Sequence, residues 1–228
     1  MLMSLTYWLF VGGVLLLTAF IGYATFATAR LLEHWRPERN ILLHPGENLV
    51  RLAIILLCLG LGKLSGLSYE QLGWQFHQPT RQLLAGIVIG LGLGFCFYQA
   101  TRWVMQRAGR RFYSTMVIEQ IVPASRRELV LVLLALLPAV ILEELLFRSL
   151  LLGGLAPILP LSLLLVGLSI FFGLLHSPQG LWGMAGAGLA GLLFGGIFLW
   201  QGSLLTPLAA HYVTNAFQIV QAMRFYRR

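Results

Sequence analysis

Aspartate is absent from the 228 residues, lysine occurs once, and charged residues make up only 11% of the chain. Soluble domains carry roughly 25% charged residues, so this composition excludes an ordinary soluble protein. The two cysteines, Cys58 and Cys96, are far apart and lie in apolar segments, so neither a disulfide framework nor a cysteine-based zinc site is predicted. Without aspartate, a Ser-His-Asp triad is excluded as well.

Hydrophobic residues make up 58% of the chain and gather in long runs. About 20 apolar residues are enough for a helix to cross a bilayer. We therefore predict an all-α, polytopic membrane protein of about seven transmembrane helices, forming one transmembrane domain over residues 1–228. The predicted spans are 5–29, 48–66, 82–104, 128–152, 160–177, 181–200 and 204–223.

The 16 basic residues are concentrated in gaps between these runs, and 13 of them fall on one side of the predicted bundle. A nucleic-acid-binding protein would gather them on a soluble face, so nucleic acid is not predicted as a partner. Because basic residues favour the cytoplasmic side, we expect a cytoplasmic C-terminus and a non-cytoplasmic Met1. The 13 are Arg30, Arg36, Arg39, Arg51, Arg102, Arg107, Arg110, Arg111, Arg126, Arg127, Arg224, Arg227 and Arg228.

Small residues recur every four positions in two of the runs, which favours close packing between helices. In the third run they are Gly86, Gly90 and Gly94, and in the sixth they are Gly183, Ala187, Gly191 and Gly195. The basic stretch 106–127 contains interspersed apolar residues and predicts either an amphipathic helix at the membrane interface or a solvated loop.

Two adjacent glutamates, Glu143 and Glu144, lie deep in the fourth run, where an ionisable group costs at least about 2.5–3.5 kcal/mol. Arg148 follows Glu144 by four residues in the favoured orientation, so we predict a structural ion pair between them. Successive helical residues point about 100° apart, which leaves Glu143 without a partner in its own helix. Glu143 is therefore the candidate acid–base group.

Two further polar pairs lie in later runs. Phe172 and His176 are one helical turn apart, and so are His211 and Asn215. Counting about 1.5 Å per residue, Glu143, His176 and His211 could share one layer of the bundle, with the loosest match for His176. Taken singly, each could instead satisfy a neighbouring helix by hydrogen bonding, and Phe172 is read as packing.

These residues resemble the three motifs of the CAAX prenyl protease and bacteriocin-processing family of intramembrane proteases. The motifs are Glu143-Glu144-x-x-x-Arg148, Phe172-x-x-x-His176 and His211-x-x-x-Asn215, in that order, within a predicted catalytic core at 126–223. The resemblance implies a helical bundle with a water-filled cavity, water activated by Glu143 and His176, and an oxyanion held by His211 and Asn215. Ser149 departs from the glycine that often follows the motif arginine.

Two questions stay open at the sequence level: metal dependence and the class of function. A metal-free glutamate mechanism is favoured over zinc, because the compact HExxH spacing is missing, but Glu143, His176 and His211 could serve as zinc ligands. The protein could instead be a proton-coupled transporter that uses the same ionisable groups, or a catalytically silent membrane scaffold. The expected partners of a protease are a membrane-associated protein or peptide substrate and the lipid bilayer.

Overall fold

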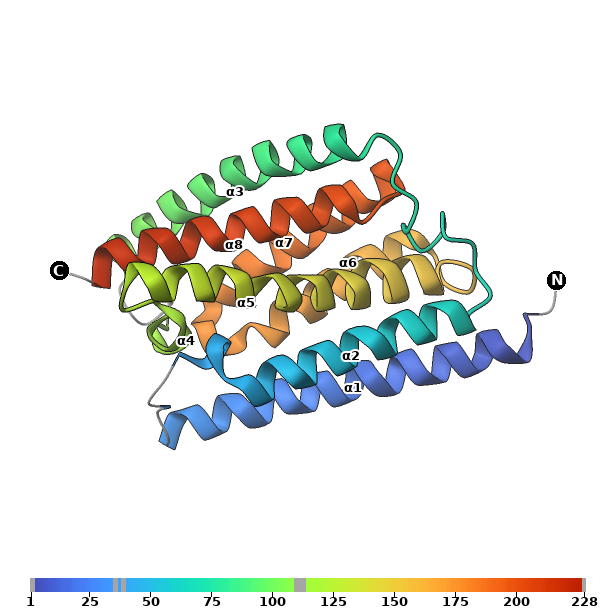
Figure 1. The fold of residues 1–228 in the computed structure, drawn as a ribbon, viewed down its shortest axis with the longest axis horizontal. Helices are drawn as coiled ribbons and strands as arrows, with labels where there is room; N and C mark the ends of the chain where they lie inside the picture. The colour runs from blue at the N-terminus through green and yellow to red at the C-terminus, as the bar shows by residue number, and fades with distance from the viewer. Residues whose placement is uncertain (1–2, 35–36, 38–39, 109–113, 227–228) are drawn as a thin grey trace.

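The fold of this computed structural model is all-α (Figure 1), and the structure describes residues 3–34, 37, 40–108 and 114–226. Within them, seven long helices run lengthwise through the molecule, and a short one, α4, lies at one end. The helices are α1 (Leu5–His34), α2 (Pro45–Leu64), α3 (Pro79–Ala108), α4 (Met116–Ile121), α5 (Arg126–Glu144), α6 (Leu161–Leu175), α7 (Gly180–Gln201) and α8 (Leu205–Tyr226).

Each of the seven predicted apolar runs is helical, but seven membrane crossings are not confirmed. In the described part of the chain, four helical segments are long and apolar enough to cross a membrane. Of the others, α6 has only 15 residues because it begins after Pro160 and ends before His176. Polar side chains such as His211 and Asn215 occur along α8. The four segments are Leu5–Leu32, Pro79–Arg107, Arg126–Gly153 and Ser177–Gln201.

The fourth run changes its helical geometry at Glu144. From there the chain continues as a π-helical segment, η3 (Leu145–Gly153), and all nine of its residues are buried. π-Helical turns are rare in proteins and frequently lie at functional sites. Arg148 lies within this segment, and no pattern in the sequence predicted the π-helical geometry.

The glycine ridge of α3 packs against α8, as predicted. A Cβ atom at Gly86 would lie 2.6 Å from the Cβ of Ala209, and one at Gly90 would lie 2.6 Å from the carbonyl oxygen of Ala210. These distances leave no room for a side chain. The small residues therefore let the two helix backbones approach closely.

The ridge predicted in α7 is only partly an interface with another helix. Gly191 lies against Ser169, and Gly195 lies against Leu165, so these two glycines pack on α6. A Cβ at Gly183 would instead meet the side chain of Gln179 just before its own helix. At Gly183 the nearest neighbour is thus the preceding turn, and a helix–helix contact there stays a prediction.

The segment between α2 and α3 closes one end of the bundle. Leu72 is fully buried there, and its carbonyl oxygen accepts a hydrogen bond from the Ser149 hydroxyl at 2.7 Å. The carbonyl of Gly73 accepts a second bond, from the Leu204 amide at 2.9 Å. A connection that the sequence presents as a plain loop therefore packs into the core beside η3 and the start of α8.

The opposite end of the bundle carries α4 and the described parts of the predicted basic stretch. The C-terminal ends of α1, α3 and α8 and the N-terminal end of α5 all lie at this end, whereas the two chain termini lie at opposite ends (Figure 1). The stretch 106–127 contains the end of α3 and the six-residue α4, whose Ile121 carbonyl accepts a hydrogen bond from Asn40 at 2.8 Å. Residues 109–113 lie outside the described part.

Seven of the 13 arginines assigned to one side belong to described segments at this end: Arg30, Arg51, Arg102, Arg107, Arg126, Arg127 and Arg224. The other six, Arg36, Arg39, Arg110, Arg111, Arg227 and Arg228, lie outside the described residues, as does Met1.

Candidate active site

A buried ion pair lies at the junction of α5 and η3. Glu144 is fully buried, and its Oε1 lies 2.9 Å from Nη1 of Arg148, whose exposed fraction is 2%. This is the pair that the four-residue spacing predicted. Because both charges are removed from solvent, each depends on the other, and loss of either partner would leave an uncompensated charge in the core.

His211 of α8 joins this pair, which the sequence did not predict. Its Nδ1 lies 2.7 Å from the same oxygen, Oε1 of Glu144. A carboxylate can only accept a hydrogen bond, so Nδ1 carries the proton and donates it. Glu144 thereby fixes the orientation of the imidazole and leaves Nε2 pointing away from the ion pair.

Glu143 lies on the other side of this imidazole. Its Oε2 is 3.6 Å from Nε2 of His211, and its side chain is 36% exposed, whereas that of Glu144 is fully buried. The adjacent glutamates therefore occupy different environments, as their angular separation on the helix predicted. Arg51 of α2 also interacts electrostatically with Glu143, so the N-terminal half of the chain contributes a cation near the site. From the sequence, Arg51 was used only to predict the membrane topology and was not expected near the site.

Two aromatic rings enclose the buried charges. The Arg148 guanidinium carbon lies 5.0 Å from the ring centre of Phe172 and 5.6 Å from that of Phe194. The His211 ring stacks on Phe194 with a centroid distance of 5.0 Å. These contacts place aromatic rings around the ion pair and add cation–π attraction. Phe194 was missed because an apolar residue in an apolar run carries no sequence signal.

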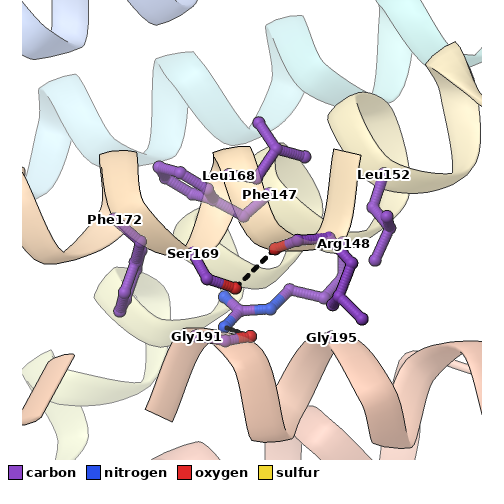
Figure 2. Close-up of a pocket in the computed structure, with 9 residues that line it drawn as sticks. Phe147, Arg148, Leu152, Leu168, Ser169, Phe172, Gly191 and Gly195 are labelled. Atoms are coloured by element: carbon purple, nitrogen blue, oxygen red, sulfur yellow. Dashed lines mark hydrogen bonds between the residues drawn. The ribbon is translucent and has the colours of Figure 1, made fainter. Parts of the chain in front are cut away.

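Arg148 also reaches α7, as Figure 2 shows. Its Nη2 lies 3.4 Å from the carbonyl oxygen of Gly191, next to Ser169, whose hydroxyl donates to the Leu165 carbonyl at 2.6 Å. The cavity lined by these residues has a volume of about 10 Å³, which is enough for roughly one water molecule. This cavity is therefore too small to hold a peptide.

His176 lies at the C-terminal end of α6, slightly apart from the other motif residues. Its Nδ1 is 2.7 Å from the Phe172 carbonyl oxygen, and its ring centre is 4.7 Å from that of Phe172. The Phe172 ring centre is in turn 6.1 Å from that of His211. Phe172 thus connects the two histidines, and no ion pair or hydrogen bond links His176 to Glu143 among the described side chains.

Asn215 lies one turn after His211 on α8 and is half-buried. Within the described residues its side chain has no hydrogen bond, so its amide donors are available. The structure therefore brings Glu143, Glu144, Arg148 and His211 together, with Asn215 one turn away from His211.

The residues do not fit a zinc site. In the described part of the chain, no three His, Cys, Asp or Glu side chains gather closely enough to hold a metal ion. The alternative ligand set Glu143, His176 and His211 is therefore not assembled, since His176 folds back onto its own helix. Cys58 is buried and Cys96 is exposed, and both are free thiols.

The segment that contains these residues matches a known protein family. Residues 125–217 match a family model described as type II CAAX prenyl endopeptidase Rce1-like. No curated protein and no solved structure matches the chain. The matched segment begins just before α5 and includes all three motifs. Residues 125–217 therefore form a domain of the Rce1-like family of type II CAAX prenyl endopeptidases.

Proposed function

We propose that this protein is an intramembrane endopeptidase that hydrolyses a peptide bond of a membrane-associated protein or peptide. The observation that carries the proposal is the arrangement of Glu143, His211 and Glu144. A partly exposed carboxylate faces one nitrogen of an imidazole, at 3.6 Å, while a buried carboxylate holds the other nitrogen at 2.7 Å. Membership of the matched segment in a protease family supports the same reaction class.

In this proposal Glu143 is the general base. It removes a proton from the attacking water, and such proton transfer typically contributes 10²–10⁴-fold to the rate. Its exposed fraction of 36% allows water to reach the carboxylate. Glu144 cannot take this role, because its side chain is fully buried and is already held by Arg148 and His211.

His211 and Asn215 stabilise the oxyanion that develops on the peptide carbonyl. Removal of one donor from such a site typically costs roughly 3–4 kcal/mol. For His211 to donate to the oxyanion, Nε2 must carry a proton, while Nδ1 donates to the carboxylate of Glu144. Glu144 is therefore a positioning residue in this scheme, and Arg148 balances its charge.

His176 assists Glu143 in activating water, as the family resemblance implies. Its Nδ1 donates to the Phe172 carbonyl, so Nε2 is the nitrogen left to accept a proton or to hold the water. The proposed scheme routes no step through a metal ion, because the candidate ligands are not assembled.

Reconstitution in liposomes distinguishes this proposal from a proton-coupled transporter or a silent scaffold. A peptide with a lipid anchor and a fluorophore–quencher pair reports cleavage, and a pH-sensitive dye inside the vesicles reports proton flux under an imposed gradient. We expect peptide release without proton flux. Proton flux without peptide release would establish the transporter, and neither signal from a folded protein would favour the scaffold.

We also propose one transmembrane domain over residues 1–228, with the catalytic core at 126–223, seven crossings, and a cytoplasmic C-terminus. The arginine-rich helix ends at one end of the bundle support this orientation. The test uses Arg110→Cys or Arg228→Cys in a protein without Cys58 and Cys96. A membrane-impermeant thiol reagent should label both positions from the cytoplasmic side only. Labelling from opposite sides would contradict the seven-crossing proposal.

A further inference from the structure

The basic end of the bundle carries a set of exposed arginines, which we call the arginine rim. They belong to the last turns of α1, α3 and α8 and to the first turn of α5, which all lie at this end of the bundle (Figure 1). The rim consists of Arg30, Arg102, Arg107, Arg126, Arg127 and Arg224, and all six side chains are exposed. This concentration of charge contrasts with the apolar surfaces of the helices between the two ends.

The rim has no acidic partners within the described part of the chain, where none of the six arginines forms an ion pair with a carboxylate. The nearby acids serve local structure instead. Glu119 accepts a hydrogen bond from the Thr115 hydroxyl at 2.7 Å. Glu128 accepts one from the Ala124 amide at 2.8 Å, just before α5. The positive charge of the rim is therefore not neutralised by these side chains.

Two arginines of the rim occupy the first turn of α5, where cations are unfavourable. Arg126 and Arg127 directly follow the N-cap residue Ser125, whose side chain accepts a hydrogen bond from the Glu128 amide. The helix macrodipole places partial positive charge at this end, so two arginines there repel it. An anion bound at this position would offset both the charge of the two arginines and the partial positive charge of the helix end.

Two other arginines of the rim stack on aromatic rings of α3. The Arg102 guanidinium carbon lies 5.7 Å from the Tyr98 ring centre, and that of Arg107 lies 5.9 Å from the Trp103 ring centre. Trp103 is 59% exposed, on a helix long and apolar enough to span a membrane. Tryptophans of spanning helices are enriched at the level of lipid headgroups. A stacked guanidinium keeps its N–H edges free, and these edges match a phosphate group.

From these observations we propose that the arginine rim binds the phosphate groups of anionic phospholipids. The tryptophan level on α3 favours a lipid headgroup over a soluble anion. Because the rim carries positive charge, it should favour headgroups with a net negative charge over neutral headgroups. This surface is separate from the catalytic residues, so the proposal does not depend on the protease function.

Thermal unfolding in nanodiscs tests the proposal. The protein is compared in phosphatidylcholine alone and in a mixture of phosphatidylcholine with phosphatidylglycerol. We expect a higher Tm in the mixture, and we expect Arg102→Gln/Arg107→Gln to lower this increase by about 4–8 °C without changing Tm in phosphatidylcholine. The matched control is Lys63→Gln/Arg81→Gln, which removes two exposed cations at the other end of the bundle and should retain the full increase.

Several outcomes would overturn the proposal: no increase for the natural protein, an equal loss in both double variants, or the same increase when inorganic phosphate is added to phosphatidylcholine nanodiscs. The last result would assign the rim to soluble anions. If Arg102→Gln/Arg107→Gln does not fold in phosphatidylcholine, Arg126→Gln/Arg127→Gln takes its place. That variant should lose the lipid-dependent increase in the same way, and retention of the increase would contradict the proposal.

Discussion

Replacement of Glu143 by glutamine is expected to give an abundant, folded protein that no longer cleaves peptides. Glutamine keeps the shape of the side chain and can hydrogen-bond, but it cannot remove a proton from water. The rate should therefore fall by about 10²–10⁴-fold, while substrate binding and Tm stay close to those of the unmodified protein. Peptide release in liposomes, substrate binding and thermal unfolding of the same preparation measure the three quantities.

The control for this variant is Glu70→Gln, which removes an exposed glutamate in the connection between α2 and α3. It should leave both the cleavage rate and Tm unchanged. A cleavage rate for Glu143→Gln equal to that of the control would exclude Glu143 as the base.

Replacement of Glu144 by glutamine should instead destabilise the protein. Arg148 would remain as an uncompensated charge in the core, and breaking such a buried pair costs about 3–5 kcal/mol. His211 would also lose the carboxylate that accepts its Nδ1–H. We therefore expect a low yield, a lower Tm and aggregation in detergent, measured by size-exclusion chromatography and thermal unfolding.

Exchange of the charges at positions 144 and 148 separates the contribution of Glu144 to stability from its contribution to cleavage. A protein with Glu144→Arg and Arg148→Glu restores an ion pair in the poorer orientation, so part of the lost stability should return. Cleavage should not return, because the side chain next to His211 Nδ1 would then be a cation. If Glu143→Gln proves unstable while Glu144→Gln is stable and inactive, the roles assigned to the two glutamates are reversed.

Interactions along one helix could be predicted from the sequence because helical geometry fixes them. The spacing of Glu144 and Arg148 predicted an ion pair, and the structure contains it. The difference in exposure between Glu143 and Glu144 follows from their angle on the helix. The small residues of α3 likewise predicted close packing, and the contact of Gly90 with Ala210 of α8 shows it.

Contacts between helices could not be predicted in the same way, because they depend on how the helices are rotated and packed. The bond from His211 to Glu144 joins residues 67 positions apart. The interaction of Arg51 with Glu143 joins α2 to α5. Counting residues along the helices gave only a loose match in depth between His176 and Glu143. In the structure, the ring of His176 lies against Phe172 at the end of α6. The sequence also did not predict the π-helical turns after Glu144, whose residues are all buried.

Mass spectrometry of protein termini in membranes tests the central claim most directly, because it needs no assumption about the substrate. Membranes are prepared from cells that carry either the unmodified protein or Glu143→Gln at equal abundance. If Glu143 is the base of an endopeptidase, a set of new termini from membrane-associated proteins should be present with the unmodified protein and absent with the variant. Identical sets of termini in the two membranes would contradict the assignment of this site to peptide hydrolysis.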